Sequence, residues 1–140
     1  MISAAIEAAN LPTSKSNTLH LKLHGWREEA GSGFEAVYGS DISEVHAISD
    51  DDPALGELIH PRLPYRKREI VWAARREYAR TTEDVLARRT RALFLNAQAA
   101  IEAAPEVSQI LARELGRGED WRVRDLERFL AIAKGYKFTA

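Results

Sequence analysis

Apolar residues recur every three or four positions through the second half of this 140-residue chain, and such spacing is typical of amphipathic α-helices. A helix is predicted over residues 66–79, with an apolar face formed by Ile70, Ala74 and Tyr78. The next helix starts near residue 81 and places on one face Leu86, Leu93, Ala97 and Ile101. Pro105 is predicted to open a further helix that ends near Gly116, and a last helix stops at Gly135.

The first part of the chain is less regular. Residues 2–9 have helical composition, residues 13–17 form a polar linker, and leucine alternates with polar residues over positions 19–24, which favours a short extended segment. We interpret residues 1–18 as the remnant of a preceding domain's last helix plus a linker. Residues 19–140 then form a helical domain.

Two short helices are predicted between these regions. Asp41 and Glu44 resemble a capping box that opens one of them, and Pro53 stands in the first turn of the other. Trp72 adjoins an apolar face and is predicted in the core, whereas Trp26 can be assigned to neither core nor surface. The expected fold is all-α, a compact bundle of about six helices with a short extended N-terminal segment leading into it.

Several classes of functional site are excluded by composition. The chain contains no cysteine, which rules out disulfides, iron–sulfur clusters, thiolate zinc sites and a cysteine nucleophile. The motifs GxGxxG, HExxH and GxSxG and a P-loop are missing as well. His20 and His24 would lie about 13 Å apart on an extended segment, too far to share a metal ion. We therefore predict no catalytic, cofactor-binding or metal-binding residue in this chain.

Charge is unevenly distributed. Residues 1–60 contain three basic and ten acidic side chains, and residues 61–91 contain ten basic and four acidic ones. The two regions can attract each other within the fold, or the basic one can form a docking surface for a nucleic acid or an acidic partner. Two helices joined near residues 80–82 resemble a helix-turn-helix, but Glu83 and Asp84 in the first turn would repel phosphates.

One ion pair and one helix cap are predicted in this basic region. Arg89 falls within the apolar stripe of its helix and Glu77 occupies the equivalent place on the preceding helix, so the two are expected to pair across the seam. Thr81 and Asp84, three residues apart, are expected to cap the second helix. Arg88 should form an outward contact with Asp84.

The chain also resembles a known family. The resemblance is carried by Leu-Pro-Tyr at 63–65, by residues 69–77 and by the pattern Arg-Thr-x-x-Asp-x-Leu-x-x-Arg-Thr-Arg over residues 80–91. Residues 21–26, 38–41 and 52–56 fit the same family. These segments are similar to the C-terminal helical domain of FAD-dependent, aerobic-type glycerol-3-phosphate dehydrogenases. At Arg66 family members commonly carry a hydroxyl residue, so this helix start departs from the pattern.

The resemblance implies a parent enzyme that oxidises sn-glycerol 3-phosphate to dihydroxyacetone phosphate, with FAD as cofactor and a quinone as electron acceptor. No catalytic or flavin-binding residue of the family maps onto residues 1–140, so the chain alone is expected to be inactive and to bind no cofactor. Its expected role is a stabilising or docking cap on the flavin domain of its own parent chain. The implied location is cytoplasmic, and the parent enzyme is expected on the cytoplasmic face of the membrane. A homo-oligomer of the parent is an open alternative. Alternatives are a free-standing helical protein-interaction module and, after it, a nucleic-acid-binding helical domain.

Overall fold

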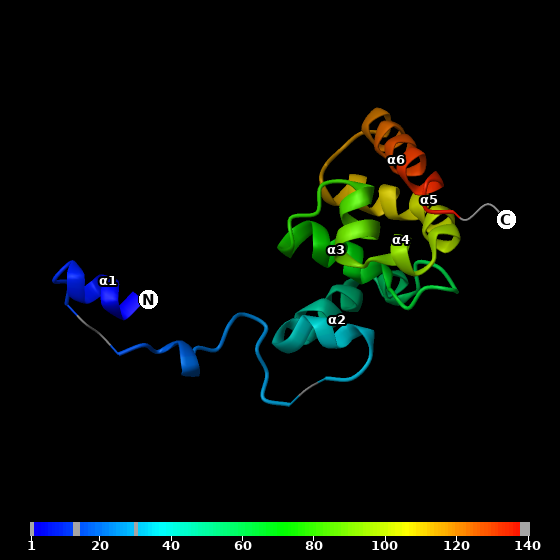
Figure 1. Ribbon diagram of the computed structural model, residues 1–140. Coiled ribbons are helices and arrows are strands. Elements are labelled where there is room, and N and C mark those ends of the chain that lie inside the picture. Colours follow the sequence, from blue (N-terminus) through cyan, green and yellow to red (C-terminus); the bar gives the residue numbers. More distant parts are fainter. Residues whose placement is uncertain (1, 13–14, 30, 138–140) are drawn as a thin grey trace.

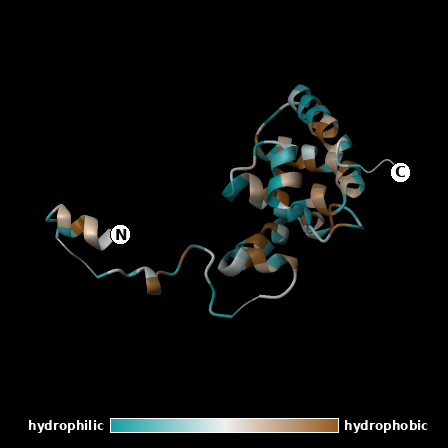
Figure 2. Ribbon diagram, in the orientation of Figure 1, coloured by the Kyte–Doolittle hydropathy of each residue, from teal (hydrophilic) through white to brown (hydrophobic). Residues whose placement is uncertain are grey.

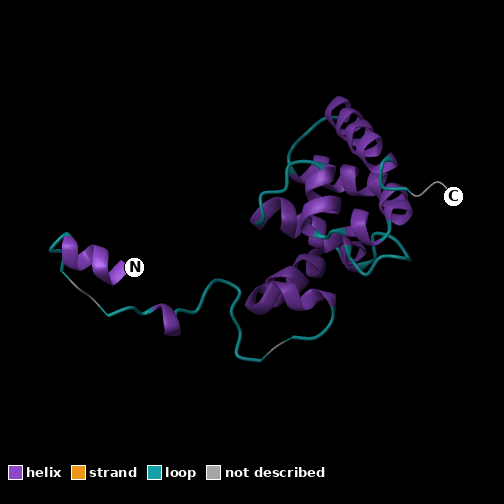
Figure 3. Ribbon diagram, in the orientation of Figure 1, coloured by secondary structure: helices purple, strands orange, loops and turns teal. Residues whose placement is uncertain are grey.

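A computed structural model describes residues 2–12, 15–29 and 31–137 of the protein. It consists of an N-terminal arm that extends away from a compact helical body (Figure 1). Helices and turns account for the body, as Figure 3 shows. Within the described ranges there is no strand, and one isolated bridge pairs Leu58 with Arg66. The prediction of an all-α bundle is confirmed.

The body is built from helices of different lengths, and the two longest among the described residues lie in its second part. Those of the first part are η2 (Phe34–Asp41), α2 (Ile42–Asp51) and η3 (Pro53–Gly56). The second part consists of α3 (Lys67–Arg76), the π-helical η4 (Asp84–Arg89), α4 (Ala92–Leu95), α5 (Ala97–Glu114) and α6 (Glu119–Lys134). Helix α5 contacts α3, α4 and α6, and therefore forms the centre of the bundle.

The core lies where α3, α5 and α6 meet. Ile70 from α3, Leu111 from α5 and Phe129 from α6 have essentially no exposed surface, and Leu86 from η4 joins them. Trp72 is buried as predicted, with its ring edge-on to Tyr38. Burying large apolar side chains from three helices supplies the main driving force for folding a domain of this size.

The segment predicted as one helix after residue 81 is divided into three, which corrects the sequence-based expectation. Arg91 adopts a left-handed backbone with φ 58° and separates η4 from α4. Asn96 separates α4 from α5 because its side chain accepts a hydrogen bond from the Ala99 N–H at 3.0 Å, a strong N-cap. Pro105 opens no helix but lies inside α5, where it contributes no backbone donor.

Helix α3 ends earlier than predicted. Its last residue is Arg76, and Tyr78 takes a left-handed backbone with φ 60°. The Ala79 N–H then bonds back to the Ala73 carbonyl at 2.9 Å, which closes the end of the helix. Tyr78 is 76% exposed, so its predicted place on the apolar face with Ile70 and Ala74 is wrong.

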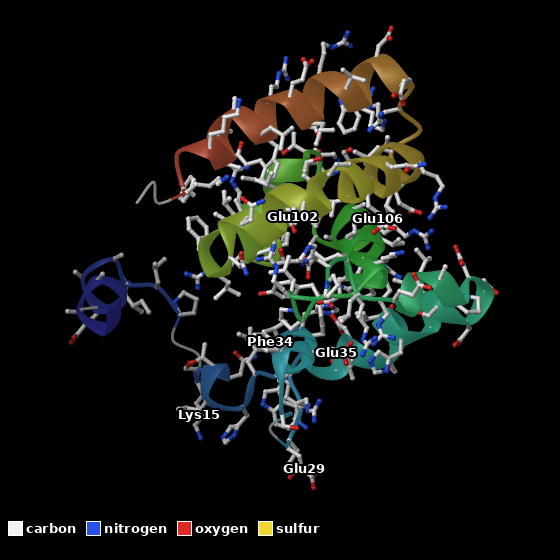
Figure 4. All side chains as sticks on the ribbon, turned by 90° about the vertical axis from the view of Figure 1, so that its right-hand side faces the viewer. Lys15, Glu29, Phe34, Glu35, Glu102 and Glu106 are labelled. Atoms are coloured by element: carbon white, nitrogen blue, oxygen red, sulfur yellow. The ribbon has the colours of Figure 1, made fainter. Side chains whose placement is uncertain are left out.

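The N-terminal arm, residues 2–12 and 15–29, contains α1 (Ile2–Ala8) and the short turn η1 (Thr18–His20). The predicted helix over residues 2–9 is thus present, but the segment predicted as extended begins with a 3-10 turn instead. In Figure 4, Lys15 and Glu29 of the arm lie away from α5, which carries Glu102 and Glu106.

The arm is attached to the body by a backbone contact. The Ser40 N–H donates to the Gly25 carbonyl at 3.0 Å. A Cβ atom at Gly39 would lie 1.7 Å from the same carbonyl oxygen, and Gly39 has φ 53°, so both space and backbone require glycine. His24 pairs with Asp41 at 2.7 Å. Asp41 makes no side-chain cap, contrary to the predicted capping box, because η2 runs directly into α2 and leaves no N-cap conformation.

The uneven charge is satisfied largely inside the fold. Arg68 pairs with Glu35, Lys67 pairs with Glu57 at 2.8 Å, and Arg76 pairs with Glu44 at 3.4 Å. Each pair joins the basic helix α3 to the acidic first part of the chain. This supports internal attraction as the interpretation of the charge pattern. In the part of the chain that the structure describes, no helix has the length and apolar character needed to cross a membrane.

Candidate docking surface

The most distinctive sequence motif, residues 80–91, begins with a helix cap. Thr81 Oγ1 accepts a hydrogen bond from the Asp84 N–H at 3.1 Å, and Asp84 Oδ2 accepts one from the Thr81 N–H at 3.0 Å. Arg88 donates to the Asp84 carboxylate and to that of Glu83. Burial opposes ionisation of Asp84, but hydrogen bonds from Arg80, Thr81 and Arg88 hold its pKa below the ordinary value. These contacts fix the first turn of η4.

Glu77 and Arg89 lie together, but chiefly through a backbone atom. Arg89 donates from Nε and Nη2 to the main-chain carbonyl of Glu77 at 3.0 and 2.7 Å, whereas its closest approach to the carboxylate is 3.8 Å. The two side chains are 35% and 32% exposed, so Arg89 is not enclosed by the apolar stripe as expected. Burial raises the pKa of Glu77, and the Arg89 charge offsets only part of that rise. The contact caps the end of α3.

Other polar groups of the motif also bind partners within the body. Arg80 Nη1 donates to the carbonyls of Ala74 and Ala79, both at 2.9 Å. Thr82 donates from its N–H and its hydroxyl to Asp125 Oδ2 at 2.9 and 2.6 Å, in a fully buried contact with α6. The motif therefore joins α3, η4 and α6. The helix-turn-helix interpretation needs Arg88, Arg89 and Arg91, and the first two of these donate to groups of the body.

A second polar cluster lies between η2 and the start of α3. Tyr38 donates its hydroxyl proton to Glu69 Oε2 at 2.9 Å, and the Arg66 N–H donates to Glu69 Oε1 at 2.6 Å. Burial raises the pKa of Glu69, and burial together with the Glu69 charge raises the pKa of Tyr38. Glu69 thus caps the start of α3 although Arg66 has no side-chain hydroxyl, and it connects η2 to α3.

Three of the four histidines have carboxylate partners rather than one another. His24 pairs with Asp41, His46 with Glu35 at 3.1 Å and His60 with Glu102 at 2.8 Å. Among the described residues, no three side chains of the metal-binding types come together.

An open groove runs between α4 and the end of α6. It encloses about 570 Å³ and is lined by Leu93, Phe94, Leu95, Ala97, Gln98, Gly135, Tyr136 and Lys137. The Phe94 and Tyr136 rings meet edge-on with centroids 5.4 Å apart. The groove offers mainly apolar contact surface.

Large apolar side chains gather on the arm. We define the apolar arm surface by its exposed members, Leu11, Leu19, Leu21, Leu23 and Trp26. Leu19 is 90% exposed, and Figure 2 shows hydrophobic positions along the arm, away from the body. Large exposed apolar patches mark interaction surfaces, so we take these side chains as a candidate docking surface. The candidate functional surface is therefore a docking surface on the arm.

Sequence reasoning found the leucine alternation of the arm but not its exposure. Alternating leucines signal a segment with one apolar face, whatever surface covers that face. The positive-φ residue Tyr78 was also missed, because glycine is the usual sequence signal for that backbone and none stands there.

Comparison with known proteins gives a consistent result. A family model described as the C-terminal domain of alpha-glycerophosphate oxidase matches residues 7–122. The mitochondrial glycerol-3-phosphate dehydrogenase of Bos taurus is 31% identical over 160 residues, which cover 97% of this chain and 22% of that protein. Glycerol-3-phosphate dehydrogenase 2 of Mycobacterium bovis is 37% identical over 94 residues, covering 67% of this chain and 15% of that protein. The chain thus spans about a fifth of the length of its mammalian relatives. No solved structure matches it.

Proposed function

Because the chain belongs to the family defined by the C-terminal domain of alpha-glycerophosphate oxidase, we propose that it is the non-catalytic helical cap of an FAD-dependent glycerol-3-phosphate dehydrogenase. In this proposal the remainder of the enzyme binds FAD and oxidises glycerol 3-phosphate. The cap packs against that remainder and stabilises it. Residues 1–18 belong to the junction between the two parts.

The observation that carries the proposal is the apolar arm surface beside a body with its own core. The body buries leucines such as Leu86 and Leu111 in its core, while the arm leaves Leu19, Leu21 and Leu23 exposed. Covering one leucine side chain contributes roughly 1.5–3 kcal/mol. Three such side chains on the arm therefore offer a favourable contribution to docking against a second domain.

The proposal is tested by removing the arm's apolar character from the full-length enzyme that contains this domain. The triple variant Leu19→Ser, Leu21→Ser and Leu23→Ser removes three large apolar contacts. We expect a thermal inactivation rate raised by about tenfold or more, since 1.4 kcal/mol of lost contact energy already corresponds to that factor. FAD retention after gel filtration and dye-linked dehydrogenase activity are the measurements.

Leu58→Ser is the matched control, because Leu58 is an exposed leucine of the body rather than of the arm. It should leave inactivation and FAD content unchanged. A triple variant as stable as the unaltered enzyme would refute docking through the arm. Full activity and stability after deletion of residues 19–140 would refute the cap function itself, and would favour an independent helical interaction module.

A further inference from the structure

Tyr78 occupies a backbone position that a bulky side chain normally avoids. It follows the last residues of α3 in the left-handed conformation, φ 60°, where helix ends usually carry glycine. For a residue with a Cβ this conformation costs about 1 kcal/mol, and for an aromatic residue it is a true outlier. Such strain persists only where the surroundings impose it, and it concentrates at functional positions.

The surroundings of Tyr78 hold the backbone on both sides. Arg89 binds the carbonyl of Glu77 through two nitrogen atoms, at 3.0 and 2.7 Å. On the other side, the Ala79 N–H bonds to the Ala73 carbonyl at 2.9 Å, and Ala79 is fully buried. The residues on both sides of Tyr78 are thus held by hydrogen bonds, and these contacts keep the Tyr78 side chain turned away from the core.

The ring itself is held by a cation. Arg80 Cζ lies 4.0 Å from the centroid of the Tyr78 ring, within cation–π range. The Arg80 guanidinium is anchored in turn by the carbonyls of Ala74 and Ala79. Tyr78 nevertheless remains 76% exposed, so the cation–π contact does not bury the ring. The result is an aromatic side chain presented to solvent beside an anchored positive charge.

Tyrosine and arginine are enriched among the residues that carry most of the binding energy of protein interfaces. A ring already held by a cation loses less conformational entropy when it enters a pocket, and the Arg80 nitrogens other than Nη1 can donate to carboxylates or carbonyls. We infer that Tyr78 and Arg80 form a second docking point, which anchors this domain to the flavin-binding part of the same enzyme through an apolar pocket rimmed by acidic or carbonyl groups.

This occupant follows from the proposed function, on which the inference rests. The mammalian relatives extend well beyond the segment that this chain matches, as the 22% coverage shows, so most of the enzyme in that family lies outside the domain and is available as a partner. The Arg80 guanidinium against the ring fits an acidic or carbonyl-rich partner surface. A docking role for the Tyr78 ring then accounts for the strained backbone at this position.

The test combines two readouts with opposite expected signs. Tyr78→Gly relieves the left-handed strain, so the 140-residue chain should unfold at a temperature about 3 °C higher. In the full-length enzyme the same variant should inactivate about tenfold faster and retain less FAD, because the anchor is gone. A purely structural role cannot produce both results.

Two further variants complete the design. Arg91→Gly relieves the same kind of left-handed strain at an exposed site outside the proposed docking point, and should raise the unfolding temperature without faster inactivation. Tyr78→Phe keeps the ring and should behave like the unaltered enzyme.

Each other outcome overturns the inference. Tyr78→Gly could lower the unfolding temperature of the chain, which would make the ring part of the fold. An unchanged enzyme lifetime would remove the docking role, and faster inactivation by both glycine variants would assign the effect to loosened backbone. If the 140-residue chain forms a dimer and Tyr78→Gly abolishes it without changing the lifetime of the enzyme, the ring belongs to an interface with a second copy of the chain. Deletion of residues 19–140 without effect would instead refute the cap function, so the two failures are distinguishable.

Discussion

The arm and the body contain the same apolar residue types but differ in how far the side chains are buried. Leu86, Leu93 and Leu111 of the body are buried, whereas Leu19 and Leu23 of the arm are exposed. The body's leucines recur at helical spacing and meet a second helix, so they cover one another. The arm's leucines alternate along a short segment that meets no sheet in the described ranges. Apolar patterning therefore identifies side chains that require a covering surface, and the body provides that surface while the arm does not.

The largest test of this comparison is a core truncation. Phe129→Ala removes a ring that is 1% exposed at the junction of α5 and α6, and should lower the free energy of unfolding by about 3–5 kcal/mol. Leu19→Ala in the arm should change it by less than about 0.5 kcal/mol, because the side chain is already in water. Denaturant unfolding of the 140-residue chain measures both. A cost above about 1 kcal/mol for Leu19→Ala would show that the arm is part of the core.

A medium effect is expected at the junction of the two regions. Gly39→Ala places a Cβ atom 1.7 Å from the Gly25 carbonyl oxygen and should break the hydrogen bond from Ser40. Lost hydrogen bonding and left-handed strain together should cost about 2 kcal/mol. Trypsin should then cut faster after Lys22, since the arm is no longer attached.

Gly116→Ala serves as its control. Gly116 also has positive φ, 61°, but no atom lies within 4 Å of an added Cβ, so only the strain of about 1 kcal/mol should appear. Equal costs at both positions, with unchanged cleavage after Lys22, would show that the backbone contact does not attach the arm.

The smallest effect concerns acid sensitivity inside the body. Glu102 accepts hydrogen bonds from Gln98, Arg62 and His60, and these contacts lower its pKa from 4.5 to about 2. A carboxyl whose folded pKa is depressed stabilises the fold above its unfolded pKa, and this contribution is lost as the pH falls from about 4.5 to about 2. Because the site is exposed, the change should be small.

Thermal unfolding between pH 7 and about pH 2 measures this contribution, with NMR titration of the Glu102 carboxyl as the direct readout. Glu102→Gln should flatten the acid limb while leaving stability at neutral pH slightly lower. A carboxyl that titrates near 4.5 in the folded chain would contradict the expectation. The arm is a useful reference, since none of the carboxyls with a depressed pKa in the described residues lies on it.

The sequence predicted the fold class and most helix ends because those depend on local signals. Gly116 and Gly135 end helices as expected, and Asp52 and Pro53 start η3. The predictions were wrong where tertiary contacts determine the helix bounds or the partner of a side chain. Pro105 lies within α5 because the helix already starts at Asn96, whose capping side chain was a readable but overlooked signal. Sequence spacing also brought Glu77 near Arg89, but it could not show that the guanidinium binds a carbonyl.

The candidate surface was predictable only in part. The leucines of the arm can be read from the sequence, yet their exposure depends on which elements the body offers as partners. The presentation of Tyr78 depends on two arginines, Arg80 and Arg89, that bind backbone carbonyls on either side of it. Long-range contacts of this kind leave no periodic pattern.

The two arginines that hold the end of α3 also constrain the order in which substitutions can accumulate. With tyrosine at position 78, replacing Arg89 by lysine removes the two hydrogen bonds from one guanidinium to the Glu77 carbonyl, since an ammonium group lacks the planar pair of donors. With glycine at position 78, the turn forms without those hydrogen bonds, and the same replacement becomes nearly neutral. The effect of a change at Arg89 therefore depends on which residue stands at position 78.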